Sequence, residues 1–385
     1  MDLPAIADPS VRRAVRLMYV GSGLLFLATI SLGIANGVME AVSRAQVLAH
    51  FHAGTIGWVT LSVIATAMWA FSGPRALSPA TGTYSMVLAG AGTAMVAGYV
   101  FAFASAFNGG PMWLLPLFGI PTAFVIWGGL GFVAIHWKAE PRGGPHWLLA
   151  GALIVASVGA LMGVLVGIGY ATGSFSVAVG AHAGPMDMYI ALAFAGIVEA
   201  FLLPSVAARW PAKVQAVVFT LSGLITAGAL LAGMPQLAPV AFLLFLTGFG
   251  FYMVRVGWRT FTQPSAPGLF WGGLFLPVYV LLFTALVFMY FIPEKPLPHA
   301  LEVSFMHITF IGMATNLVFT VQIGQLGPID GVQRMGIWLT NIGLLAFIAG
   351  EFMAERPDGA YLMAIGLLVV LARTMPAMWR GARAT

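Results

Sequence analysis

Residues 46–72 read QVLAHFHAGTIGWVTLSVIATAMWAFS and contain no Asp, Glu, Lys or Arg. About 20 apolar residues are enough to cross a bilayer as a helix, so this stretch predicts a transmembrane span. Stretches of similar length and character recur along the chain. There are twelve in all, at 14–38, 46–72, 83–108, 112–137, 146–171, 183–207, 214–234, 236–257, 268–292, 300–325, 333–352 and 359–378.

The composition excludes a water-soluble globule. The chain is 60% hydrophobic and 8% charged, with a mean hydropathy of +0.95. In lipid every backbone amide must be bonded within its own segment, so spans of this length must be helices. The pattern also differs from the alternating strands of about 10 residues that build an outer-membrane barrel. We therefore predict one all-α polytopic transmembrane domain over residues 1–385.

The basic residues predict the orientation. With the N-terminus in the cytoplasm, 14 of the 17 Lys and Arg residues fall in inner segments and only Arg44, Lys295 and Arg356 fall in outer ones. This positive-inside bias predicts a multi-pass protein of the bacterial inner (cytoplasmic) membrane with both termini cytoplasmic. Residues 1–13 lack an apolar core, so no cleavable signal peptide is expected. The basic balance indicates topology and contact with membrane lipid, and no nucleic-acid partner is expected.

Five of the seven histidines lie at or near the starts of three spans that are four spans apart. His50 and His52 open the second span, His182 the sixth, and His299 and His307 the tenth. Even-numbered spans begin on the outer side, so all five are expected near one face of the bilayer. Ionisable side chains inside a membrane are costly and commonly bind metals, substrates or protons. The pattern indicates a heme or metal site held between helices.

A weak internal repeat accompanies these histidines. His52-Ala53-Gly54 is echoed by His182-Ala183-Gly184, and His307 follows His182 by 125 residues, close to the 130 that separate His52 from His182. Internal repeats are common in membrane folds. Three pseudo-symmetric arcs of four helices would explain this spacing.

Twelve spans, cytoplasmic termini, a threefold repeat and histidines on spans two, six and ten resemble subunit I of the heme-copper oxidase superfamily. The resemblance implies that histidines of spans two and ten bind a low-spin heme. A second histidine of span ten, two residues earlier, would bind a high-spin heme, and histidines of spans six and seven would bind copper. His52 or His50 matches the span-two ligand, His307 the low-spin ligand of span ten, and His182 the first copper ligand.

Several positions depart from that pattern. Phe305 stands where the high-spin ligand is expected, and the seventh span contains no histidine. Met186 stands where many oxidases have a tyrosine four residues after the copper ligand. Oxygen reduction in the family requires both missing parts, so we expect no terminal oxidase and no proton pump.

In size the chain is similar to the NnrS family of twelve-span heme proteins, which is associated with the response to nitric oxide. His50-Phe51-His52 resembles the His-x-His pair of an early NnrS span, and residues 324–327 form a Gly-rich end to the tenth span. The Trp-His-x-His-Glu-Met form of the NnrS motif is not present. The resemblances imply a heme-binding protein of redox or nitric-oxide metabolism, with quinol, a c-type cytochrome or another redox subunit as partner.

The expected cofactor is heme b. The chain has no cysteine, so the Cys-x-x-Cys-His attachment of c-type heme is impossible. Residues i and i+2 of a helix point about 200° apart, so His50 and His52 cannot bind one iron together. The shared Ala-Gly context favours His52 as the inward residue, and His52 with His307 is the best predicted axial pair.

A second set of residues completes the predicted site. His182 with Met186 could hold copper, because imidazole and thioether suit that metal. Arg44 and Arg356 could pair with heme propionates, since guanidinium groups bind carboxylates well. Pro185 suits the first turn of a helix, which would leave His182 in the lead-in before the sixth helix.

The alternative is a twelve-span proton-coupled solute transporter. In that case the intramembrane histidines with Asp187 or Glu199 would bind substrate or protons. The loop at residues 72–77, Ser-Gly-Pro-Arg-Ala-Leu, lacks the Asp-Arg and basic cluster typical of the major facilitator group. Asn316, deep in the tenth span, is expected to make a hydrogen bond between helices.

Overall fold

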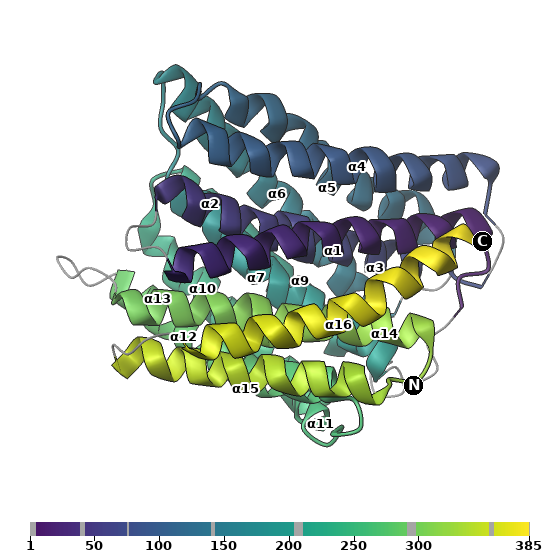
Figure 1. Ribbon diagram of the computed structural model, residues 1–385. Coiled ribbons are helices and arrows are strands. Elements are labelled where there is room, and N and C mark those ends of the chain that lie inside the picture. The colour runs from purple at the N-terminus through teal and green to yellow at the C-terminus, as the bar shows by residue number, and fades with distance from the viewer. Residues whose placement is uncertain are drawn as a thin grey trace.

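The computed structural model describes residues 5–38, 43–74, 77–139, 143–203, 211–290, 298–353 and 358–384. These residues form helices and no strands. Twelve helices are long and apolar enough to cross a membrane, so the prediction of an all-helical, twelve-span chain is confirmed. The spans lie side by side, and the two termini lie at the same end of the bundle (Figure 1).

The spans are continuous helices or helices interrupted by short π-helical segments. In chain order they are α1 (Pro9–Val38); α2, η1 and α3 (Arg44–His52, Ala53–Thr60, Leu61–Ser72); α4 (Pro79–Ala106); α5 (Leu114–His136); α6 (Gly144–Thr172); α7 and η3 (Val179–Ile197, Val198–Leu202); α9 (Pro211–Leu231); η4, α10, η5 and α11 (Pro235–Leu237, Ala238–Tyr252, Met253–Gly257, Trp258–Thr260); α12 (Pro267–Tyr290); α13, η6 and α14 (His299–His307, Ile308–Thr315, Asn316–Leu326); α15 (Gly331–Met353); and α16 (Asp358–Arg383).

One boundary expectation is wrong. Pro185 lies inside α7, which begins at Val179, so His182 is a helical residue and not part of a lead-in. Proline lacks an N–H and removes one backbone hydrogen bond wherever it sits inside a helix. Packing against neighbouring helices compensates for this loss in a membrane protein, which sequence propensity alone does not reveal.

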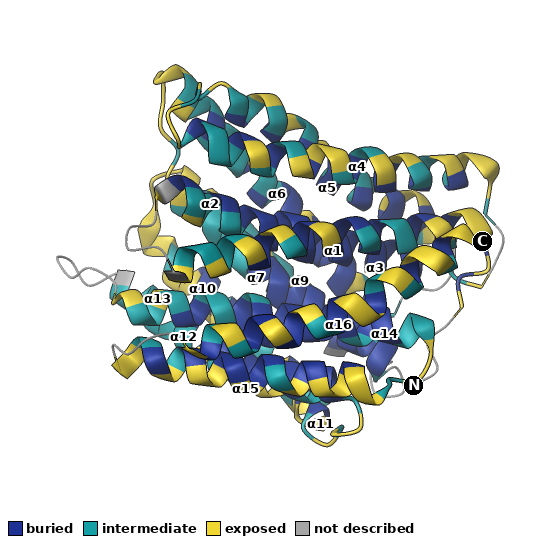
Figure 2. Cartoon of the chain, in the orientation of Figure 1, coloured by how far each residue is buried: buried dark blue, intermediate teal, exposed yellow. Residues whose placement is uncertain are grey.

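Spans two, six and ten form the interior of the bundle. In spans two, six and ten the most apolar window is 89%, 89% and 78% buried, against 28–61% in the other nine spans. Figure 2 shows the contrast, with α7 and α3 mostly dark blue and α4, α15 and α16 striped with exposed residues. The histidines therefore sit on helices that are surrounded by protein.

π-Helical segments begin directly after His52 and His307. Each widened turn leaves backbone carbonyls that threonines satisfy, since Thr60 and Thr315 donate to the carbonyls five residues earlier at 2.9 and 2.7 Å. The Trp58 indole donates to the Thr315 hydroxyl at 2.9 Å and joins the two segments. π-Bulges are frequent at functional sites.

Asn316 makes the predicted contact between helices. Its amide exchanges two hydrogen bonds with Asn341 of α15, at 2.7 and 2.9 Å. It also donates to the Gly312 carbonyl at 2.8 Å. Span ten is thus held on one side by α15 and on another by span two.

The loop before α15 supplies a pH-dependent contact. Arg373 donates to Asp330 at 2.7 Å, and this bond, with the backbone N–H of Gln333, holds the pKa of the Asp330 carboxyl below its usual range. A depressed folded-state pKa stabilises the fold above the ordinary carboxyl pKa and loses that effect in acid. We expect Asp330→Asn to unfold slightly more easily than the parent at neutral pH. The difference should shrink as the pH falls through and below the ordinary carboxyl pKa; a thermal-melt series that shows a constant difference would contradict this assignment.

Candidate functional site

Four histidines in the three central spans are fixed in the same way. In each, Nδ1 lies 2.7–2.9 Å from a backbone carbonyl, the pairs being His50–Thr29, His52–Leu48, His182–Gly159 and His307–Val303. A carbonyl only accepts, so Nδ1 carries the proton and donates. Nε2 is left with a free lone pair, which is the arrangement found in histidines that bind metals.

The His50 and His307 rings are neighbours. Their ring centroids are 6.4 Å apart and their planes are inclined by 30°. Two imidazoles that bind one metal ion from opposite sides, each at a nitrogen–metal distance of about 2 Å, have centroids about 6 Å apart. The pair therefore has the separation that a bis-histidine metal site requires.

A glycine in α1 makes room for His50. A Cβ atom placed on Gly33 would lie 2.9 Å from Cε1 of the imidazole, closer than real Cβ contacts come. The Thr29 carbonyl, one turn earlier on the same helix, accepts from Nδ1. Helix α1 thus fixes both the position and the tautomer of His50.

His307 is packed against the aromatic ring of Phe347 on α15, with centroids 4.6 Å apart. On the other side of the span, Phe305 is buried and stacks on Tyr279 of α12 at 5.5 Å. Phe305 stands at the position where the resemblance to heme-copper oxidases places the high-spin ligand, and its side chain packs against other aromatic rings instead.

His52 does not share the position of His50. It stacks on Phe103 of α4 with centroids 3.8 Å apart and contacts the Tyr99 ring at 5.8 Å. It also lines a cavity together with His182. The Ala-Gly context predicts His52 as the partner of His307, whereas in the structure the His50 ring lies next to the His307 ring. The 200° separation of residues i and i+2 is what sends the two side chains to different neighbours.

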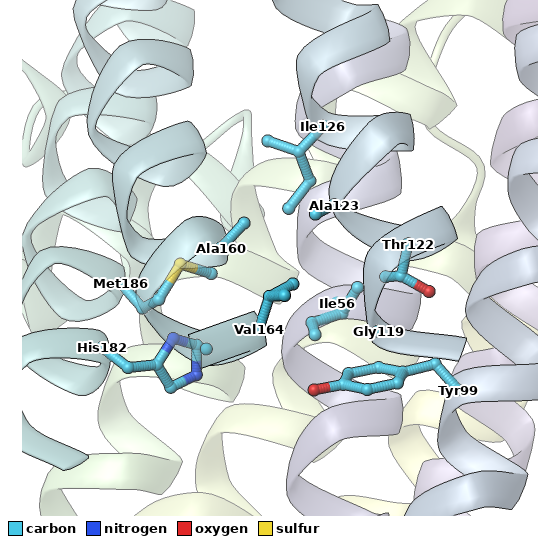
Figure 3. A pocket seen from close by; sticks show the side chains of 11 residues that line it. Ile56, Tyr99, Gly119, Thr122, Ala123, Ile126, Ala160, Val164, His182 and Met186 are labelled. Carbon is cyan, nitrogen blue, oxygen red and sulfur yellow. The ribbon is translucent and has the colours of Figure 1, made fainter. Parts of the chain in front are cut away.

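His182 and Met186 lie on one wall of a second, smaller cavity (Figure 3). Gly163 of α6 leaves space for the His182 imidazole, because a Cβ there would lie 2.8 Å from the ring. Over the described ranges, no three His, Asp or Glu side chains form a group that could hold a metal ion. His52 lines the neighbouring cavity together with His182.

The predicted propionate partners are not placed. Arg356 and Lys295 fall outside the described residues, as does the side chain of Arg44, whose backbone begins α2. His299 is the first residue of α13 and is exposed.

A buried ion pair near the end of span six that lies away from His182 was not predicted from the sequence. Arg255 of η5 donates to both carboxylate oxygens of Glu199 in η3, at 3.1 and 3.3 Å. Gln215 of α9 donates to the same carboxylate at 3.3 Å and accepts from Arg255. Arg255 is one of the basic residues assigned to the inner segments, and its place within the predicted stretch 236–257 is the signal that could have indicated a buried partner. Glu199 is fully buried, so the pair neutralises a carboxylate within the protein interior.

Two comparisons with known proteins found no match. No protein-family model matches the chain, and no curated protein matches it. The description of the site therefore depends on its own geometry.

Proposed function

We propose that this chain is a heme-b-binding membrane protein of redox or nitric-oxide metabolism, with His50 and His307 as the two axial ligands of the iron. The observation that carries the proposal is the 6.4 Å separation of the two imidazoles. Their anchored Nδ1 atoms leave both Nε2 atoms available. The arrangement of histidines on spans two, six and ten supports a fold related to subunit I of heme-copper oxidases and an NnrS-like role.

The protein residues would supply ligation, orientation and exclusion of water. Heme bound here would supply one-electron chemistry, with a potential set by its ligands and surroundings. The Thr29 and Val303 carbonyls accept from the two imidazoles, which raises the basicity of the ligands and fixes the ring orientations. If heme is bound, His50 and His307 would both hold its iron, and an iron held by two protein ligands would favour electron transfer over binding of oxygen.

A pyridine hemochrome assay on the purified protein tests the proposal. After expression with adequate heme supply, we expect the absorption bands of heme b, since no cysteine is present to attach heme covalently. A colourless preparation would contradict the proposal and leave the proton-coupled transporter as the surviving alternative.

The glycine beside His50 provides a second test. Gly33→Ala should displace the imidazole and lower the fraction of low-spin heme several-fold, because the added methyl group would lie 2.9 Å from the ring. Gly37→Ala, one turn further along α1, is the matched control, since no atom lies within 4 Å of its added Cβ. Absorption spectra of the two variants measure the effect; equal spectra would show that Gly33 does not position a ligand.

A further inference from the structure

A cavity of about 90 Å³ lies between α2, α4, α5, α6 and α7, on the other side of span two from the His50–His307 pair. Its polar side chains are His52, His182, Tyr99 and Tyr170, and no charged side chain lines it. The aromatic rings of Phe103, Phe107 and Tyr170 form much of the wall. Tyr170 is 43% exposed and lies near the end of α6, so the cavity is close to the surface at the end where α7 begins.

The hydrogen-bonding character of this cavity follows from the two tautomers. His52 and His182 donate through Nδ1 to the Leu48 and Gly159 carbonyls, so each has an unprotonated Nε2 that accepts. The Tyr99 hydroxyl has no hydrogen-bond partner within the described part of the chain, and Figure 3 shows it directed toward His182. The cavity thus combines two acceptors with one hydroxyl that can donate.

The volume restricts what can enter. An engineered cavity of about 150 Å³ holds benzene, and one water molecule occupies about 30 Å³ of liquid. The space of about 90 Å³ is smaller than that benzene site and suits a molecule of roughly three or four non-hydrogen atoms. An ion is disfavoured as well, because burying a charge without a charged partner costs several kcal/mol.

We infer that this cavity is a binding site for a small uncharged molecule with N–H or O–H donors. The ligand donates two hydrogen bonds, one to Nε2 of His52 and one to Nε2 of His182. An acceptor atom of the ligand accepts a hydrogen bond from the Tyr99 hydroxyl. The aromatic rings exclude bulk water and provide contacts for a flat ligand. Binding in this cavity does not require heme at His50 and His307. His52 follows His50 by two positions on the same helix, so the two proposed sites share span two.

The test is a titration of the purified full-length protein labelled with ¹⁵N-histidine. The NMR chemical shifts of the histidine Nε2 resonances are the readout. The probe is formamide, which is small, uncharged and carries two N–H donors. Acetonitrile is the matched control, because it has the same number of non-hydrogen atoms and no N–H or O–H donor. We expect formamide to shift the His52 and His182 resonances saturably at millimolar concentrations and to leave exposed His299 unchanged. Acetonitrile should be at least tenfold weaker.

Two variants locate the site. Gly167→Leu should abolish the formamide shifts by filling the cavity that Gly167 lines; its added Cβ makes only ordinary contacts, at 3.5 Å or more, so folding is expected to survive. His307→Ala should leave the shifts intact, which separates this site from the proposed heme site. Unsaturable shifts, equal binding of acetonitrile, or shifts that persist in Gly167→Leu would each overturn the inference.

Discussion

Replacing His50 by alanine is expected to abolish the low-spin heme spectrum, whereas replacing His52 is expected to preserve it. The two residues lie on one helix and differ in their neighbours: the His50 ring lies next to the His307 ring at 6.4 Å, while His52 stacks on Phe103 at 3.8 Å. Removing one of two axial ligands leaves the iron five-coordinate or lost from the protein. Absorption spectra of the reduced proteins measure the difference.

His52→Ala is the matched control, since it removes the same side chain two residues away. His307→Ala should reproduce the loss seen with His50→Ala, because both ligands are needed for a low-spin iron. If His52→Ala loses the low-spin spectrum and His50→Ala retains it, the axial pair is His52 and His307, as the sequence alone predicted, and our assignment is wrong.

The Arg255→Met variant should be strongly destabilised. It leaves the fully buried Glu199 carboxylate with Gln215 as its one side-chain hydrogen-bond donor among the residues that the structure describes. Removing one partner of a buried ion pair typically costs about 3–5 kcal/mol. Denaturant unfolding of the detergent-solubilised protein, or loss of the folded fraction on heating, measures the effect.

Two variants control for the loss of a guanidinium group. Arg259→Met removes an exposed cation that lies over the Trp258 ring at 5.2 Å and should change stability by less than about 1 kcal/mol. The double variant Glu199→Leu with Arg255→Met should recover most of the lost stability, because apolar replacements of a buried pair are often neutral. An Arg255→Met protein as stable as the parent would show that the ion pair is not needed.

The spans could be predicted because hydrocarbon thickness and backbone hydrogen bonding determine their length and type. Residues 46–72 lack charge and correspond closely to the observed span Ala45–Ser72. The spacing of the histidines also singled out spans two, six and ten, which are the three most buried spans in the structure. Hydropathy does not report π-helical turns, so the segments after His52 and His307 could not be foreseen.

The partners of the histidines could not be predicted from sequence spacing. Which of His50 and His52 faces span ten depends on helix rotation, which is fixed by contacts such as Gly33 of α1 and Phe103 of α4. The sequence of one helix does not contain those contacts. The same holds for Glu199, whose partner Arg255 lies 56 residues away on another span.

Electron paramagnetic resonance of the oxidised, purified protein, together with near-infrared magnetic circular dichroism, tests the central claim most directly. These spectra report the two axial ligands of a ferric heme. We predict a single low-spin heme with two neutral imidazole ligands, and loss of that signal in both His50→Ala and His307→Ala. A high-spin signal, a histidine–methionine signature, or the absence of any heme signal would contradict it.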